Sequence, residues 1–281
     1  MLWMMLGSAL FSINFAVIRH LGQDLHPFEI VFFRNLFGLL VFIPWLIRAE
    51  ITSLKPNRPM LLGGRACIQV VAQAFWYASL MLIPLADATA LGLVEPIIAA
   101  FLAILILREK STFGRWAVVF IGFIGSLIIV RPGFQDVSIG ALYAVLSSVT
   151  WAGFALLSKV LTKTDSTLVV VAYPTALVVP LALIPALFVW EVPSLANYGW
   201  LIVTGSLAST ANFALTKAFK MGDITAVSPI GFTRLLFSAA VGFIVFAEVP
   251  AAWVWVGGAL IVGAGTYLAR LEAQAKNGTD N

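Results

Sequence analysis

The chain has 281 residues, of which 61% are hydrophobic and 11% are charged, and its mean hydropathy is +1.00. Soluble domains are about 45–50% apolar and about 25% charged, so a globular fold could not keep this much apolar surface out of water. Composition therefore predicts a membrane protein and excludes a soluble one. The net charge of +4 is no evidence for a nucleic-acid partner, because the basic residues have a topological explanation given below.

The sequence has few of the side chains that hold metals and cofactors. Cys67 is the single cysteine, and His20 and His26 are the only histidines, so no disulfide framework and no protein metal centre are expected. No phosphate-binding loop of the GxxxxGK[ST] type is present. We therefore expect neither a cofactor nor a metal.

Ten apolar segments are long enough to cross a bilayer, which takes roughly 20 residues of helix. Polar residues, prolines and glycines separate them. In chain order we predict spans at 2–21, 27–47, 59–83, 85–107, 113–131, 138–160, 167–189, 195–219, 223–247 and 252–270. The connections are mostly short, which leaves no room for a soluble catalytic domain.

Lysine and arginine in the loops predict the direction of the spans, because these residues are enriched on the cytoplasmic side. Only Arg19 and Arg131 fall at one end of the predicted helices, whereas twelve fall at the other. Those twelve are Arg48, Lys55, Arg58, Arg108, Lys110, Arg115, Lys159, Lys163, Lys217, Lys220, Arg270 and Lys276. Both termini, including a tail at 272–281, are predicted to be cytoplasmic, in a bacterial inner membrane.

The two halves of the chain resemble each other. Ala86–Ala90, before the fourth span, matches Gly222–Ala226, before the ninth, at an offset of 136 residues. Three further matches have an offset of 139, which a three-residue insertion within the ninth span would reconcile: Glu109 with Glu248, Trp116 with Trp255, and Arg131 with Arg270. The two halves are predicted at 1–131 and 138–271.

Each half has five spans, so the second half must enter the membrane in the opposite direction. Inverted repeats are typical of secondary transporters, which bind substrate near the midplane where the repeats meet. The predicted fold is therefore an all-α integral membrane protein. Its ten transmembrane helices form two inverted five-helix repeats around a central cavity.

Glu95 and Arg234 are the deepest charges in the predicted spans, and the 139-residue offset makes them equivalent positions. A charge at the bilayer centre costs about 2.5–3.5 kcal/mol on insertion scales, so it usually faces protein or water. One interpretation is a buried ion pair, or a protonated Glu95, that holds the halves together. The other is a substrate site in which Arg234 binds a carboxylate and Glu95 binds an ammonium group or a coupling proton.

Proline at position 96 strengthens the case for a site at this depth. Inside a helix it frees the carbonyl of Gly92, and such a break is tolerated where neighbours or water satisfy the freed group. A simple packing kink is the alternative. Arg34 and Arg65 also lie within predicted spans, and for both a structural role is favoured over substrate contact.

Polar and aromatic residues follow helical spacing in several spans. One stripe on the third span is formed by Arg65, Gln69, Gln73, Trp76 and Tyr77, and lipid would leave the two amides without partners. The stripe should therefore face inward, where stacked rings suit a planar or cationic substrate. Further candidates are Asn14, Trp151 and Asn212 in the first, sixth and eighth spans. Hydrogen bonds between helices or close helix packing are the alternatives.

On several of these residues the sequence resembles the EamA type of the drug/metabolite transporter superfamily. The residues are Asn14, Pro27, Arg34, Asp87–Ala90 before Pro96, Glu109, Gly122, Gly125, Trp151, Asp223–Pro229 and Glu248. The sequence departs from the pattern at Leu235, which stands where the repeat predicts the counterpart of Pro96. The resemblance implies ten helices, a central cavity and export of small metabolites without ATP hydrolysis. Length and the aromatic third span are similar to the YddG-type aromatic amino-acid exporters.

The leading functional hypothesis is a secondary transporter that exports small amphipathic metabolites, such as aromatic or neutral amino acids, by alternating access. An exporter of other metabolites or of cationic drugs is the alternative, and an intramembrane enzyme is a remote one. The expected partners are a small-molecule substrate and the lipid bilayer. Proton coupling and oligomeric state stay open.

Overall fold

The computed structural model describes residues 2–48, 56–106, 113–130, 138–161, 164–165, 167–221 and 233–277. All regular secondary structure in these ranges is helical. The first half contains α1 (Leu2–Leu21), α2 (Pro27–Arg48), α3 (Pro59–Leu82), α4 (Leu85–Gly92), α5 (Glu95–Ile106) and α6 (Phe113–Val130). The second half contains α7 (Ile139–Leu161), α8 (Thr167–Leu187), α9 (Leu195–Met221), α11 (Thr233–Phe246) and α12 (Ala252–Asn277).

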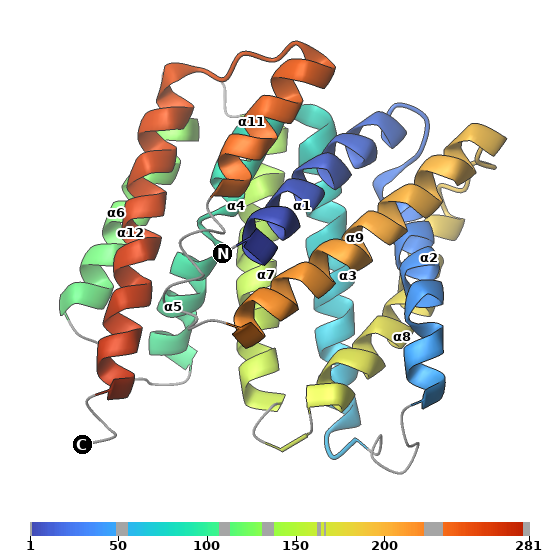
Figure 1. Cartoon of the computed structure of the whole chain (residues 1–281), viewed down its shortest axis with the longest axis horizontal. Coiled ribbons are helices and arrows are strands. Elements are labelled where there is room, and N and C mark those ends of the chain that lie inside the picture. The colour runs from blue at the N-terminus through green and yellow to red at the C-terminus, as the bar shows by residue number, and fades with distance from the viewer. Residues whose placement is uncertain are drawn as a thin grey trace.

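These helices confirm the predicted all-α fold of ten spans, with α4 and α5 together forming the fourth (Figure 1). At the C-terminus, α12 continues to Asn277, so much of the predicted tail at 272–281 is helical. Three described stretches are long and apolar enough to cross a bilayer by themselves: Leu2–Leu21, Leu85–Ile106 and Ile139–Ser158. Shorter apolar stretches lie at Trp116–Val130, Ala176–Leu187, Thr233–Phe246 and Ala252–Tyr267.

Proline and an acidic side chain fix the start of α2. The carboxylate of Glu29 accepts a hydrogen bond of 3.1 Å from the backbone N–H of His26, which caps the first turn. Pro27 occupies the first helical position, where its missing N–H costs nothing. Pro59 begins α3 in the same way.

The helix packing repeats between the two halves, as an inverted repeat requires. In Figure 1, α3 packs against α7 and α1 packs against α9, which are the same contact in the two repeats. The contact of α2 with α9 likewise corresponds to that of α8 with α3. Two further contacts, α6 with α12 and α2 with α8, join equivalent helices of the two halves. The exchange of repeats therefore maps the most extensive helix contacts onto one another.

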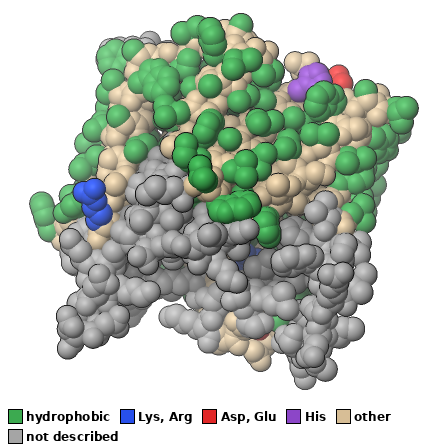
Figure 2. All heavy atoms as spheres, in the orientation of Figure 1, with side chains coloured by type: hydrophobic (Ala, Val, Ile, Leu, Met, Phe, Trp, Pro, Cys, Tyr) green, Lys and Arg blue, Asp and Glu red, His purple; other side chains and the backbone are tan. Residues whose placement is uncertain are grey.

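Small residues let α6 and α12 approach closely. A Cβ added to Gly257 would lie 2.5 Å from the carbonyl oxygen of Gly125, and one added to Gly125 would lie 2.9 Å from that of Gly257. Glycines at such contacts are typical of membrane helix pairs, which associate by close packing. On the face shown in Figure 2, the described surface carries mostly hydrophobic side chains and very few charges, as contact with lipid requires.

Candidate transport site

A cavity of about 620 Å³ lies among α1, α2, α3, α4, α5, α7, α9 and α11. Helices from both repeats therefore form its wall. Nine of the ten candidate residues from the sequence line it: Asn14, Gln69, Gln73, Trp76, Tyr77, Glu95, Trp151, Asn212 and Arg234. The lining on α9 follows helical spacing, with Gly205, Ala208, Ser209, Asn212 and Leu215 on one face. The polar stripes predicted on separate spans thus meet in one place.

The tenth candidate, Pro96, has a different role from the predicted mid-helix kink. The fourth span is interrupted: α4 ends at Gly92, and α5 begins at Glu95. Pro96 is the second residue of α5, where proline is well tolerated because the first turn needs no N–H donor. Its side chain lies outside the described ones. The interruption also leaves the carbonyl of Leu91 to accept a hydrogen bond of 3.2 Å from the Ser148 hydroxyl.

Glu95 is the first residue of α5, and its carboxylate faces the cavity at the positive end of that helix. Arg234 lies in the first turn of α11 in the other repeat and faces the same cavity. The two side chains attract each other electrostatically. A broken helix that points its N-terminus at a midplane site is a recurrent arrangement in secondary transporters, where it binds charged substrate groups.

The backbone of Arg234 is fixed, but its side chain is incompletely paired. The Ser12 hydroxyl on α1 donates a hydrogen bond of 3.2 Å to the Arg234 carbonyl, and it lies 3.0 Å from the Ser238 hydroxyl. By contrast, the buried Nε of Arg234 has no hydrogen-bond partner among the described residues. A buried donor without a partner costs about 1–3 kcal/mol, and such a group in a native structure calls for an explanation.

Two amide side chains of the cavity are held by neighbouring helices. The Thr204 hydroxyl on α9 donates a hydrogen bond to the Asn14 Oδ1 on α1. The Asn35 amide on α2 donates one of 2.7 Å to the Gln73 Oε1 on α3. Both bonds join different helices, which is the alternative role considered for these polar residues. All four residues nevertheless lie at or beside the cavity wall. These amides are therefore oriented before any substrate arrives.

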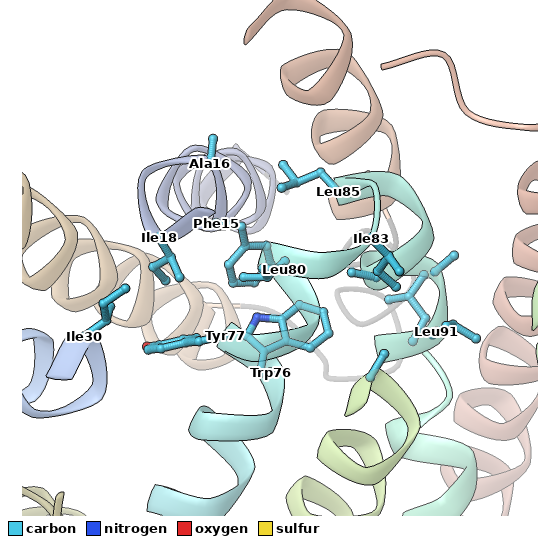
Figure 3. Close-up of a cluster of buried hydrophobic side chains, with 14 of the residues drawn as sticks. Phe15, Ala16, Ile18, Ile30, Trp76, Tyr77, Leu80, Ile83, Leu85 and Leu91 are labelled. Atoms are coloured by element: carbon cyan, nitrogen blue, oxygen red, sulfur yellow. The ribbon is translucent and has the colours of Figure 1, made fainter. Parts of the chain in front are cut away.

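Aromatic rings form one wall of the cavity. Phe15 and Trp76 meet edge to face with ring centroids 5.2 Å apart, and Tyr77 follows on α3 (Figure 3). Gly92 allows this arrangement, because a Cβ at that position would lie 2.9 Å from two indole carbons of Trp76. On α7, Trp151 and Phe154 make a second edge-to-face pair with centroids 5.0 Å apart.

Several lining residues were not predicted to belong to the site. Arg34, for which a structural role is favoured from the sequence, lines the cavity and interacts electrostatically with the Tyr77 hydroxyl. Phe11, Phe15 and Asn35 were not singled out. The amide of Asn35, one residue after Arg34 on an apolar helix, is a signal that could have identified it. An apolar lining residue such as Phe15 has no such signal, because it resembles a lipid-facing one.

Arg65 lies outside the cavity lining, in agreement with the structural role favoured for it. Its Nε donates a hydrogen bond of 2.7 Å to the Ser158 hydroxyl, and its guanidinium carbon lies 4.0 Å from the ring centroid of Phe154. Both partners are on α7. The motif Asp223–Pro229 and Glu109, quoted for the family resemblance, lie outside the described residues, as do several of the lysines and arginines that predict orientation.

One end of the bundle, called here the Arg19 end, is closed by contacts between elements. Arg19, near the end of α1, forms an ion pair with Glu248 after α11 and donates a hydrogen bond of 3.1 Å to the Ile83 carbonyl. Glu248 also accepts a hydrogen bond of 2.9 Å from the Leu85 N–H. We call this group of contacts the latch. It connects α1, the turn before α4 and the end of α11.

A second contact at the same end joins the turn before α2 to the turn after α8. The fully buried Glu29 accepts a hydrogen bond of 2.9 Å from the backbone N–H of Glu191, in addition to the bond that caps α2. Nearby, Asn197 donates one of 3.1 Å to Asp24. The two repeats are therefore joined at the Arg19 end by side chains whose charges and amides are partnered.

Comparison with known families gives the architecture a name. Residues 1–131 and residues 138–270 each match the EamA-like transporter family. The chain belongs to that family. Because both halves match the same family, the sequence duplication and the repeated helix packing have one origin. Membership also makes the chain a multi-pass membrane transporter rather than an enzyme.

Curated relatives of this EamA-like transporter carry several substrates. It is 30% identical over 248 residues to the S-adenosylmethionine uptake transporter of Rickettsia prowazekii, covering 88% of this chain and 84% of the relative. It is 29% identical over 250 residues to the riboflavin transporter of Brucella anthropi, covering 87% and 88%. It is 30% identical over 268 residues to the pseudopaline exporter CntI of Pseudomonas aeruginosa, covering 94% of each.

A protein of known crystal structure has the same fold. Its TM-score with this chain is 0.65 at 18% sequence identity, and the match covers 97% of this chain and 98% of the other. At that identity the likeness concerns the fold alone. The names of the three relatives include both uptake and export but no aromatic amino acid, so the finer placement among YddG-type exporters stays a prediction.

Proposed function

We propose that this EamA-like transporter carries a small amphipathic metabolite with an amino-acid group across the bacterial inner membrane by alternating access. The observation that carries the proposal is the buried Nε of Arg234, which has no hydrogen-bond partner among the described residues and lies near Glu95 in a cavity shared by both repeats. An α-amino acid supplies a carboxylate for Arg234 and an ammonium group for Glu95. Its apolar part would then lie against Phe15 and Trp76.

Aromatic and neutral amino acids belong to this class, which keeps the exporter expected from the sequence as its leading member. The Rickettsia relative supports the class, because S-adenosylmethionine combines an amino-acid group with a purine ring. Export and uptake are opposite directions of the same cycle in a carrier driven by the gradient of its substrate. The twelve-to-two distribution of lysine and arginine supports cytoplasmic termini, which reporter fusions at each terminus would test.

Counterflow in proteoliposomes tests the substrate class. Vesicles preloaded with unlabelled phenylalanine are placed in labelled phenylalanine, tryptophan or riboflavin, and we expect the two amino acids to accumulate. Phenethylamine lacks the carboxylate and phenylpropionate lacks the ammonium group. Each should therefore compete roughly tenfold or more weakly than phenylalanine, as expected for one lost charged hydrogen bond.

The matched control is the double variant Glu95→Gln/Arg234→Gln, reconstituted at equal amount and shown by its melting curve to be folded. Its counterflow of either amino acid should be reduced roughly 10- to 100-fold or slightly more. If riboflavin accumulates while neither amino acid does, or if both deaminated and decarboxylated analogues compete as well as phenylalanine, the amino-acid assignment is wrong. The chain would still be an EamA-like transporter, with another substrate.

A further inference from the structure

The cavity contains more positive than negative charge. Among the described lining residues, Arg34, Glu95 and Arg234 are the charged ones, from α2, α5 and α11. Arginine stays protonated in proteins, and Glu95 can neutralise only one of the two guanidinium groups. Glu95 interacts with Arg234, so Arg34 is the surplus cation.

The described surroundings of Arg34 are polar but neutral. Its guanidinium interacts with the hydroxyl of the buried Tyr77, and the neighbouring Asn35 amide is bonded to Gln73. In the described part of the chain, the one ion pair joins Arg19 to Glu248. Arg34 therefore has no carboxylate partner among the described residues. Dipoles of this kind can orient a guanidinium but cannot balance its charge.

A surplus charge at this depth is expensive unless something of opposite sign joins it. An arginine at the bilayer centre is costly, and intramembrane charges are usually paired or line a substrate pathway. Arg65 shows the structural solution in the same protein: it lies outside the cavity lining, bonds Ser158 and stacks on Phe154. Arg34 instead faces the cavity.

The two arginines lie near different rings of the aromatic wall. The Arg234 guanidinium carbon is 6.0 Å from the ring centroid of Phe15, whose ring meets that of Trp76 at 5.2 Å. Tyr77, the next residue on α3, interacts with Arg34. In Figure 3 the ring of Phe15 lies between those of Tyr77 and Trp76, which point to different sides. A ligand resting against these rings would have both arginines in the wall of the same cavity.

We propose that the transported metabolite carries a second anionic group, separate from the carboxylate of its amino-acid group, and that Arg34 and the Tyr77 hydroxyl bind it. The inference rests on the proposed function and narrows it to amino acids with an additional carboxylate or phosphate. It also separates this chain from its Rickettsia relative: the sulfonium of S-adenosylmethionine adds a positive charge, so that compound is a poor ligand here.

A matched pair of ligands tests the inference. Phenylalanine and 4-carboxyphenylalanine differ by one carboxylate, and each is used to compete with labelled phenylalanine in counterflow and to raise the melting temperature of the purified protein. We expect 4-carboxyphenylalanine to act at a roughly tenfold lower concentration than phenylalanine in both assays, as for one charged hydrogen bond. S-adenosylmethionine should act at a higher concentration than either.

Variants then locate the effect. In Arg34→Gln the ratio of the effective concentrations of phenylalanine and 4-carboxyphenylalanine should fall to about one, whatever happens to the absolute rates. Tyr77→Phe should lower this ratio in part. Arg65→Gln, which removes an arginine outside the cavity, should keep the wild-type ratio. Equal action of the two ligands on the wild type would overturn the inference, as would a ratio that Arg34→Gln leaves unchanged.

The two proposals fail in different ways. If phenylalanine is carried and its 4-carboxy analogue gains nothing, the amino-acid transporter stands and the second anionic group is wrong. If neither ligand competes in counterflow or raises the melting temperature, both are wrong. The melting temperature reports ligand binding alone. It therefore tests the inference even if the protein binds these ligands but transports them slowly.

Discussion

Two regions of the protein place an arginine near a glutamate, and they differ in how completely the two charges are satisfied. At the Arg19 end, Arg19 bonds both Glu248 and the Ile83 carbonyl, and its guanidinium carbon lies 4.8 Å from the ring centroid of Phe246. In the cavity, Arg234 is attracted to Glu95 but keeps a buried Nε without a described partner.

This difference separates structure from function. A network in which every charge has its partners stabilises one arrangement of the helices and has nothing left to offer a ligand. An incompletely paired arginine lowers the stability of the free protein, and a ligand that pairs with it restores that stability. Binding sites commonly differ from structural ones in this way. The latch therefore belongs to the conformation seen here, whereas we propose that Glu95 and Arg234 belong to the substrate site.

Removing the cavity arginine should have the largest effect on transport. We expect Arg234→Gln to reduce counterflow of phenylalanine roughly 10- to 100-fold, the factor for losing a charged hydrogen bond of about 1.5–3 kcal/mol. The melting temperature should change little, because the variant also removes a buried donor without a partner. Transport at the wild-type rate, or a variant that does not fold, would mean that the pair is structural like the latch.

Glu95→Gln should reduce transport by a smaller factor, about tenfold, because the ammonium group keeps aromatic contacts in the same cavity. The sharper measurement is the double-mutant cycle with Arg234→Gln. Groups that bind one substrate together are strongly non-additive, so the double variant should be little worse than Arg234→Gln alone. Losses that simply multiply would show that the two side chains act independently.

The sequence predicts the fold well and the site in part, for physical reasons. A bilayer requires apolar segments of fixed length, so ten spans and their inverted duplication can be inferred from hydropathy and offsets. A polar residue such as Asn14 or Gln73 stands out within such a segment, and both line the cavity. The interruption before Glu95 was less predictable, because Pro96 fits both a kinked helix and the start of a new one.

Pairings between distant elements were beyond the sequence. Arg19 and Glu248 meet because Ala247 adopts a left-handed conformation, with φ of 54°, which turns the chain back after α11. The Glu248 N–H then bonds the Gly242 carbonyl at 3.2 Å, and a Cβ at Gly242 would lie 3.0 Å from the carboxylate of Glu248. No periodicity marks a non-glycine residue for that conformation.

The latch itself offers a second test of the comparison. Arg19→Gln or Glu248→Gln should lower stability by about 1–3 kcal/mol, between the values for exposed and fully buried pairs, because the side chains are 20% and 15% exposed. The ratio of the effective concentrations of phenylalanine and 4-carboxyphenylalanine should stay as in the wild type, because neither residue lines the cavity. A changed ratio with unchanged melting would place the latch in the substrate site and contradict its structural role.

The repeat indicates what the latch does in the transport cycle. The position equivalent to Arg19 at the 139-residue offset is Ser158, which Arg65 bonds at 2.7 Å, so the equivalent positions at the two ends make different contacts. Loss of the latch should therefore shift the two access states unequally and raise the labelling of a cysteine placed at the Arg19 end, for example at Gln23, severalfold. Unchanged labelling would mean that other contacts, such as that of Glu29 with Glu191, hold this end closed.

The smallest effect concerns the aromatic wall. Gly92→Ala would place a Cβ 2.9 Å from two carbons of the Trp76 indole, closer than real Cβ contacts allow, so the ring must move. We expect phenylalanine to compete about threefold more weakly, since stacked aromatic contacts contribute about 0.5–1.5 kcal/mol and the ring is displaced rather than lost.

Gly64→Ala on α3, where no atom lies within 4 Å of the added Cβ, is the matched control. It should leave transport unchanged and stabilise the helix slightly, because alanine is the better helix former. Equal behaviour of the two variants would mean that Trp76 has room to move without affecting the substrate, and that the charges alone hold the ligand.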